Sequence, residues 1–129
     1  MEELRMEASK STPMVHFDPA SGILKMEGQS YPENAFQYYA PIQSWIDTFL
    51  EESTLPLQLN LNLIYLNTSS SKCIMDLIDR LEDAFQEGKD VKIHWHYDEE
   101  NDSALELAEE FKEGMTLPFE IIALPEEES

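Results

Sequence analysis

The sequence predicts an α/β fold of a single domain, in which a mixed sheet with an N-terminal β-hairpin and parallel crossovers packs against three to four helices. Two observations lead to this prediction. Apolar residues recur with a strand-like period in some stretches and with a helical period in others, and the two patterns alternate along the chain. The length of 129 residues also suits one domain with its own core. The predicted order is β, β, α, β, α, β, α, β.

Residues 57–88 show the change between the two patterns most clearly. Their first part alternates between apolar and polar residues, which puts one face of a strand in the core: Leu57, Leu59, Leu61 and Leu63. From Ile74 the apolar residues follow the helical period, and Gly88 supplies a C-terminal stop. The polar turn between strand and helix holds more side chains than the single N-cap that a helix needs: Asn67, Thr68, Ser69, Ser70 and Ser71.

The N-terminal part predicts a frayed end followed by a hairpin. Residues 1–10 are polar and charged without a clear period, which is typical of a mobile terminus. Residues 14–18 and 23–27 alternate on either side of a Pro-Ala-Ser-Gly turn, which is typical of an antiparallel hairpin. We expect Gly28 to end the second strand.

The first core helix is predicted at residues 35–52, with Phe36, Trp45 and Phe49 on its buried side. Pro41 lies inside this segment. Because proline clashes with the preceding helical turn, we expect a kink or a short leading helix before a main one.

The C-terminal part predicts a strand, a helix and a last strand. Residues 91–97 alternate after a short turn, so this strand should run parallel to the central one. An N-cap within residues 101–103 should start a third helix that ends at Gly114, and residues 119–123 form the last strand.

Composition argues against several classes of function. The 27 acidic and 8 basic residues give a net charge of -19, which would repel nucleic acid and anionic membranes. The single cysteine, Cys73, excludes an internal disulfide and cysteine-based zinc sites. With no membrane-length apolar run, no signal peptide and no glycine-rich nucleotide loop, we expect a cytoplasmic protein without a cofactor or membrane insertion. We assign residues 1–11 to a flexible N-terminus, 12–124 to the domain and 125–129 to an acidic tail.

The hydroxyl cluster at residues 68–71 has three interpretations. A helix N-terminus stabilises a phosphate, and phosphorylation would add about -1.5 to -2 charges beside Lys72, the one cation nearby in the sequence. Ordinary capping explains the same residues and is the stronger interpretation from the residues alone. A serine nucleophile is the third, and it lacks the Gly-x-Ser-x-Gly elbow of such enzymes.

His94 and His96 form the second candidate site. They lie two residues apart on a predicted strand and therefore share a face, as in metal-binding pairs. With Asp98 or His16 as a further ligand they would suit a metal-dependent hydrolase, which is the enzyme alternative. Two ligands do not make a site, so histidines packed against a helix at the flank of the sheet are the simpler interpretation. They could also hydrogen-bond the Thr68 cluster if their strands are neighbours.

Aromatic residues form the third candidate, a binding site for a small ligand. The set comprises Tyr31, Phe36, Tyr38, Tyr39, Trp45 and Phe49. Because a stripe at helical spacing is most often core, we assign Phe36, Trp45 and Phe49 to the core and expect Tyr31 and Tyr38 to be exposed.

Four motifs, taken together and in this order, resemble the SiaC family of bacterial regulatory phosphoproteins. They are GQSYPEN at residues 28–34, LIYLNTSSSK at residues 63–72, IHWHYD at residues 93–98 and LELAEEF at residues 105–111. The resemblance covers residues 12–123. It implies a STAS-like fold, similar to that of anti-anti-sigma factors such as SpoIIAA.

The resemblance also implies a non-enzymatic partner switch. Family members are substrates of a SiaB-like serine/threonine kinase and a SiaA-like metal-dependent phosphatase, and the phosphorylated threonine of the LNTSS motif is here Thr68. The unphosphorylated form binds and regulates a downstream partner, a diguanylate cyclase, which links the switch to cyclic-di-GMP and biofilm formation. We expect the partners to dock on the hydroxyl cluster and the exposed edge of the following helix: Asn67, Thr68, Ser69, Ser70, Ser71, Lys72, Asp76, Asp79 and Arg80.

Overall fold

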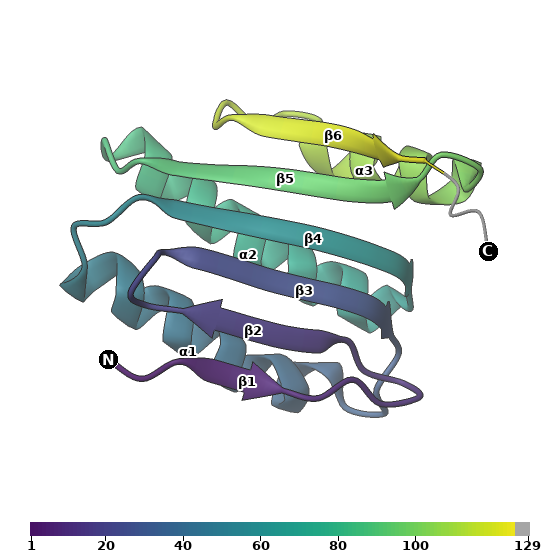
Figure 1. The fold of residues 1–129 in the computed structure, drawn as a ribbon, viewed down its shortest axis with the longest axis horizontal. Helices are drawn as coiled ribbons and strands as arrows, with labels where there is room; N and C mark the ends of the chain where they lie inside the picture. Colours follow the sequence, from purple (N-terminus) through teal and green to yellow (C-terminus); the bar gives the residue numbers. More distant parts are fainter. Residues whose placement is uncertain (126–129) are drawn as a thin grey trace.

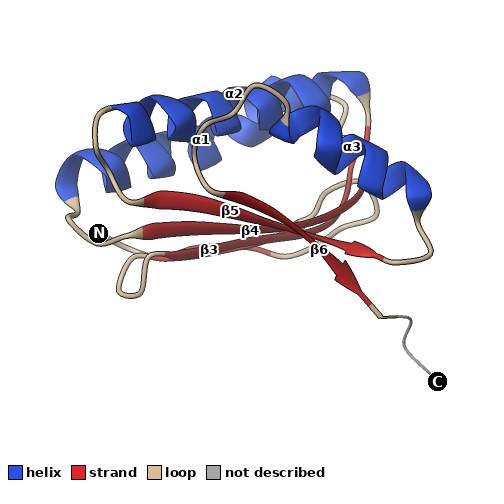
Figure 2. Cartoon of the chain, turned by 90° about the horizontal axis from the view of Figure 1, so that it is seen from above, coloured by secondary structure: helices blue, strands red, loops and turns tan. Residues whose placement is uncertain are grey.

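Strand β4 lies near the middle of a six-stranded sheet, and three helices cover one face of that sheet (Figure 1, Figure 2). The computed structural model describes residues 1–125. The strands are β1 (Leu4–Met6), β2 (Met14–Asp18), β3 (Ile23–Ser30), β4 (Leu57–Leu66), β5 (Val91–Asp98) and β6 (Phe119–Leu124). The helices are α1 (Ala35–Glu52), α2 (Thr68–Gln86) and α3 (Asp102–Lys112).

The strands lie side by side in chain order. Strands β1, β2 and β3 pair antiparallel, whereas β3, β4, β5 and β6 pair parallel, each joined to the next by one helix. This arrangement confirms the predicted mixed sheet, N-terminal hairpin and parallel crossovers. Because parallel strands all point the same way, β3, β4, β5 and β6 end at one edge of the sheet, which we call the carboxyl end.

The alternation in β4 separates the two faces of the sheet. Its four leucines are at most 1% exposed and face the helices, whereas Gln58, Asn60 and Asn62 are half-buried on the opposite face. No described helix covers that opposite face (Figure 2). The apolar stripe of α2 completes the core against the leucines and is at most 1% exposed; it comprises Ile74, Leu77, Ile78 and Leu81.

The frayed end predicted for residues 1–10 is wrong for Leu4–Met6. These residues form β1, in which Leu4 is paired with Phe17 of β2. The indole Nε1 of Trp45 also donates to the Glu2 carbonyl oxygen at 2.8 Å. A three-residue strand is too short to show a period in sequence. The division into residues 1–11, 12–124 and 125–129 stays a prediction, and residues 126–129 of the acidic tail lie outside the described residues.

Two predicted boundaries also differ. Gly28 does not end the second strand of the hairpin, because β3 continues to Ser30. Instead, the register shifts between Gly28 and Gln29, and this bulge allows the strand to continue along β4. Helix α2 begins at Thr68, so most of the predicted polar turn forms the first turn of the helix.

Helix α1 is continuous from Ala35 to Glu52 through Pro41, so the alternative of two helices is wrong. A kink at Pro41 stays a prediction. Phe49 is buried and Trp45 packs against the core, as predicted. Phe36 is 56% exposed, so its assignment to the core is wrong. It occupies the first turn of the helix, beyond the stripe that faces the sheet.

The single cysteine, Cys73, is buried on α2, and burial raises the pKa of its thiol. None of the helices in residues 1–125 combines the length and hydrophobicity that a membrane crossing requires.

Candidate functional site

Asn67 joins the central strand to the second helix and caps that helix. Its side-chain oxygen accepts from the backbone N–H of Ser70 at 2.9 Å, and its carbonyl oxygen accepts from the N–H of Ser71 at 2.9 Å. Its own N–H donates to the carbonyl oxygen of Ser30 at 3.0 Å, which ties the cap to the end of β3. Because one asparagine satisfies the cap, the hydroxyls that follow it are free for other roles.

The hydroxyls of the first turn of α2 differ in accessibility. Ser70 is fully buried, and its Oγ accepts from Ser30 Oγ at 2.9 Å. Ser30 Oγ also lies 2.7 Å from the hydroxyl of Tyr39 on α1, and burial raises the pKa of that hydroxyl. Thr68 and Ser69 are exposed and Ser71 is half-buried. The structure therefore leaves Thr68 and Ser69 most open to another protein.

The electrostatic environment of this turn favours an added anion. The first turn of α2 contains no acidic residue, and the first N–H groups of a helix have no partner within it. Thr68 and Lys72 are four residues apart, so both lie on one side of the helix, and both are exposed. A phosphate on Thr68 would meet the positive end of the helix dipole and could reach the lysine.

Exposed apolar side chains lie next to the hydroxyls at the carboxyl end. Ile64 is 56% exposed and Tyr65 is 52% exposed. The rings of Tyr65 and Tyr31 meet edge to face, with centroids 6.0 Å apart. Ile64 lies in the bulge itself, where Leu63 is paired with Gly28, Tyr65 is paired with Gln29, and Ile64 is left without a partner on β3. We call Tyr31, Tyr65, Thr68 and Ser69 the switch surface.

Sequence reasoning missed the apolar part of this surface. A signal for it exists, since the strict alternation of β4 breaks after Leu63, where Ile64, Tyr65 and Leu66 follow one another. Bulges often redirect side chains near functional sites. Continued alternation after Leu57, Leu59, Leu61 and Leu63 would bury Tyr65, but after the bulge Tyr65 is exposed.

The other predicted docking residues lie further along α2. Asp76 and Asp79 are exposed. Partial desolvation of the Asp79 carboxylate, and then the negative charges of Asp76, Asp83 and Glu82, raise the pKa of Asp79. Arg80 is half-buried, and its Nε lies 2.8 Å from Asp47 Oδ1 of α1. The Arg80 guanidinium therefore links α2 to α1 at the surface.

The histidine pair lies on the uncovered face of the sheet, so its predicted packing against a helix is wrong. The rings of His94 and His96 have centroids 6.4 Å apart. His94 Nδ1 lies 3.3 Å from Gln58 Nε2 and His94 Nε2 lies 3.7 Å from Glu120, so His94 contacts these residues and not Thr68. Burial, followed by the charge of His94, lowers the pKa of His96.

The structure gives no geometric support to the metal-site alternative. His16 is on β2, which is separated from β5 by strands β3 and β4, and its Nε2 lies 3.2 Å from Glu3. The Asp98 carboxylate accepts from the N–H of Glu100 at 2.9 Å. Within residues 1–125, no group of three His, Cys, Asp or Glu side chains is arranged to hold a metal ion.

The predicted aromatic set does not converge on one pocket within the described chain. Tyr39 and Phe49 are in the core, and Trp45 stacks on Phe49 with centroids 5.4 Å apart. Tyr31 and Tyr38 are half-buried, so the expectation that they are exposed holds only in part. Tyr38 donates to the carbonyl oxygen of Pro13 at 3.3 Å, just before β2.

Comparisons with known proteins agree with this arrangement. The family model described as SiaC family regulatory phosphoprotein matches residues 6–124. An uncharacterized protein of Pseudomonas aeruginosa strain UCBPP-PA14 is 45% identical over 123 residues, which cover 95% of this chain and 98% of that protein.

Solved structures give the same result. The crystal structure of apo-SiaC from Pseudomonas aeruginosa is similar with a TM-score of 0.91 and 45% identity, covering 95% of this chain and 100% of that chain. A chain in the crystal structure of diguanylate cyclase SiaD in complex with its activator SiaC, from the same organism, has a TM-score of 0.91 and 45% identity, covering 94% of this chain and 99% of that chain. The protein described here therefore belongs to the SiaC family of regulatory phosphoproteins.

Proposed function

We propose that this protein is a non-enzymatic phospho-switch of the cytoplasm, which a partner serine/threonine kinase phosphorylates on Thr68 and a partner metal-dependent phosphatase dephosphorylates. In its unphosphorylated form it binds and regulates a diguanylate cyclase, and so controls cyclic-di-GMP and biofilm formation. The family membership and the solved complex of a similar chain with a cyclase support this proposal.

One observation carries the proposal: Thr68 is exposed at the helix N-terminus, and its hydroxyl makes no hydrogen bond to any residue in the described part of the chain. Asn67 provides the cap, and Ser70 provides the buried hydrogen bond to Ser30. A kinase can therefore modify Thr68 without breaking a contact that holds α2 in position. Ser69 shares the exposure and is the natural control residue.

The phosphate would act through charge and hydration rather than through unfolding. It adds about -1.5 to -2 charges, and the helix dipole and Lys72 stabilise it where it stands. A partner that covers Tyr65 and Tyr31 would have to strip water from this dianion. The chain already carries a net charge of -19, so an acidic partner surface would be repelled further.

The docking surface that we propose comprises the switch surface and the near part of α2. It includes the predicted residues Asn67, Ser70, Ser71, Lys72, Asp76, Asp79 and Arg80, which differ in what they can offer. Lys72, Asp76 and Asp79 are exposed and can contact a partner directly. Ser70 is buried and Arg80 is paired with Asp47, so these two would support the surface from within.

Phosphosite mapping tests the proposal. The kinase from the native host is incubated with the wild type, Thr68→Ala and Ser69→Ala, and the phosphate is located by mass spectrometry. We expect one phosphate on the wild type and on Ser69→Ala, and none on Thr68→Ala. Labelling of Thr68→Ala at another residue would rule out Thr68 as the switch.

A pull-down from the native host then identifies the partner and the direction of the switch. The unphosphorylated wild type and Thr68→Ala should retain a diguanylate cyclase, and the phosphorylated protein should not. Retention by the phosphorylated form alone would reverse the proposed direction.

A further inference from the structure

Strands β4 and β5 separate before either of them ends. They pair from Leu57 and Val91 up to Leu61 and Trp95, although β4 continues to Leu66 and β5 to Asp98. Beyond this point β4 stays paired with β3, and β5 stays paired with β6. The sheet is therefore split at its carboxyl end, between β4 and β5.

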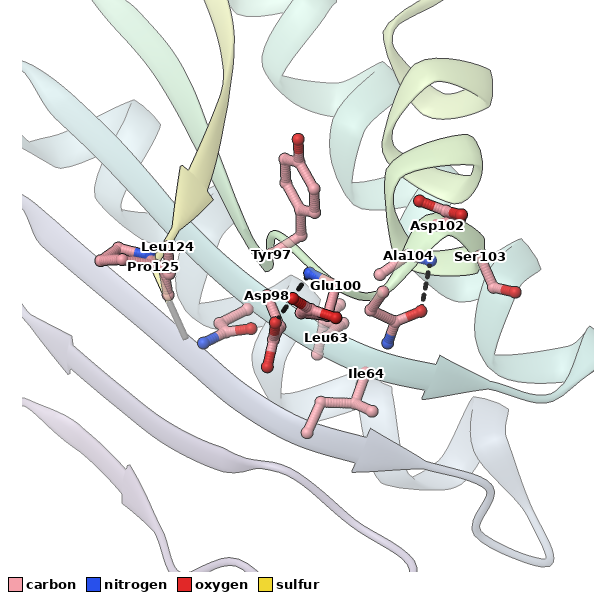
Figure 3. A pocket seen from close by; sticks show the side chains of 12 residues that line it. Leu63, Ile64, Tyr97, Asp98, Glu100, Asp102, Ser103, Ala104, Leu124 and Pro125 are labelled. Carbon is pink, nitrogen blue, oxygen red and sulfur yellow. Dashed lines mark hydrogen bonds between the residues drawn. The ribbon is translucent and has the colours of Figure 1, made fainter. Parts of the chain in front are cut away.

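The split opens into a cleft of about 900 Å³ (Figure 3). Its walls come from the end of β4, from the turn between β5 and α3 with the start of α3, and from the end of β6. The lining residues on which the argument depends are Leu63, Ile64, Asp98, Glu100, Asp102 and Leu124. A volume of this size accommodates several side chains of a peptide.

The lining combines apolar walls with an acidic rim. Ile64 is 56% exposed and Leu124 is 36% exposed, so both offer apolar surface to an occupant. Glu100 and Asp102 are exposed, and no ion pair within residues 1–125 involves either carboxylate. The described lining contains no Lys, Arg or His. The cleft is therefore complementary to an apolar side chain with cations beside it, and it repels phosphates.

The walls of the cleft also include strand edges whose backbone groups could bind a peptide. Past Leu61 and Trp95, the edges of β4 and β5 that face each other are no longer paired with one another. Unpaired strand edges bind extended peptides by main-chain hydrogen bonds, while pockets for alternate side chains provide specificity. An extended segment is thus better suited to the cleft than a compact ligand.

We propose that this cleft binds an extended segment of a protein partner, in which an apolar side chain is flanked by Lys or Arg. The apolar side chain would lie against Ile64 and Leu124, and the cations would lie near Glu100 and Asp102. This contact uses other residues than the switch surface, which adjoins it at Tyr65, and does not require phosphorylation of Thr68. It would give a partner a second attachment point on the same end of the sheet.

Peptide binding to the full chain tests this proposal. The probe is a short fluorescent peptide of alternating lysine and leucine, measured by anisotropy at physiological salt. Its two controls replace lysine by glutamate or leucine by serine. We expect the lysine-leucine peptide to bind at least about tenfold more tightly than either control, since both charge and apolar contact contribute. Amide NMR shifts should concentrate at residues 62–64, 97–104 and 124.

Matched variants separate the cleft from general attraction to an acidic protein. Glu100→Lys should weaken binding about tenfold, whereas Glu106→Lys, the same charge change on the exposed side of α3, should weaken it less than about twofold. Thr68→Ala should bind as the wild type does. If Glu100→Lys proves unfolded by circular dichroism, Leu124→Ser provides the same test through the apolar wall.

Several results would overturn the proposal. These are no binding of the lysine-leucine peptide, equal binding of its controls, equal loss in Glu100→Lys and Glu106→Lys, or NMR shifts confined to the outer side of α3. Self-association of the chain that Leu124→Ser abolishes would instead assign the cleft to a second copy.

Discussion

The two ends of the parallel sheet are built differently. At the amino end, Gly22 adopts φ +74° against the carbonyl oxygen of Pro56, and Glu82 of α2 accepts from the N–H groups of Thr116 at 2.8 Å and Leu117 at 3.0 Å. At the carboxyl end, strands β4 and β5 separate, and Ile64 and Tyr65 are more than half exposed. One end is closed by specific contacts, and the other presents unpaired edges and apolar side chains.

The difference shows how one small domain combines stability with recognition. The loops at the amino end lead into the parallel strands, and backbone hydrogen bonds tie them together: the N–H of Gln58 donates to the Gly22 carbonyl oxygen at 2.9 Å, and the N–H of Leu57 donates to that of Asp90 at 2.9 Å. The loops at the carboxyl end lead from strands into helix N-termini, where free N–H groups and a positive dipole end meet outside molecules. Ligands of α/β sheets commonly bind at this end for the same reason. Predictions that set one end against the other therefore test the whole account.

The largest effect is expected at Gly22. A Cβ at this position would lie 2.0 Å from the carbonyl oxygen of Pro56, and the positive φ adds strain. We expect Gly22→Ala to lower the free energy of unfolding by about 3 kcal/mol or more. Gly88→Ala is the matched control, because Gly88 has φ +97° but nothing within 4 Å of the added Cβ, so about 1 kcal/mol is expected there. Urea unfolding measures both, and equal losses would contradict the close approach to Pro56.

An intermediate effect is expected below the switch surface. Ser70→Ala removes an acceptor from the buried hydrogen bond of Ser30 and should lower the free energy of unfolding by about 1 to 2 kcal/mol. Ser69→Ala changes an exposed hydroxyl one residue away and should stay within about 0.5 kcal/mol. A comparison of their thermal unfolding measures this difference. Similar values for the two variants would mean that Ser30, Tyr39 and Ser70 do not hold the helix start.

A smaller, pH-dependent effect is expected at Glu82. Hydrogen bonds from the Thr116 side chain, and then from Gln86 and the backbone of Leu117 and Thr116, lower the pKa of Glu82 from 4.5 to about 2. Because the folded pKa is lowered, the stabilisation is fully present above about pH 4.5 and is lost as the pH falls toward 2.

Glu82→Gln isolates this contribution. The wild type should be the more stable protein near pH 6, and its advantage should shrink as the pH falls below about 4.5, because the variant has no carboxylate to protonate. Urea midpoints across this range measure the difference, with all other carboxylates common to both proteins. If the stability of the two proteins changed in parallel with pH, the charge of Glu82 would not contribute to the contact between α2 and the loop before β6.

Much of the fold could be predicted because its signals are local. Strict alternation marks β4, the helical stripe marks α2, and Asn101 was within the predicted N-cap region of α3. Strand β1 could not be predicted, since three residues show no period and β1 forms only by pairing with β2.

The site could be predicted only in outline. Sequence indicates hydroxyls at a helix start, but the burial of Ser70 beside the exposed Thr68 depends on Ser30 and Tyr39, which are distant in the chain. The cleft was not predictable for the same reason, because it arises where two neighbouring strands stop pairing. Phe36 is exposed because the buried side of α1 begins with Ala35 and Tyr39, a choice between neighbouring apolar residues that the helical spacing alone does not make.

The most direct test of the account is the affinity of the host's diguanylate cyclase for this protein with and without phosphate on Thr68, measured together with thermal unfolding. We predict that phosphorylation weakens binding at least about tenfold, which corresponds to about 1.4 kcal/mol, while the unfolding midpoint changes little. Unchanged affinity, or a loss of affinity that occurs only with loss of the folded state, would contradict a switch that acts through charge on an intact carboxyl end.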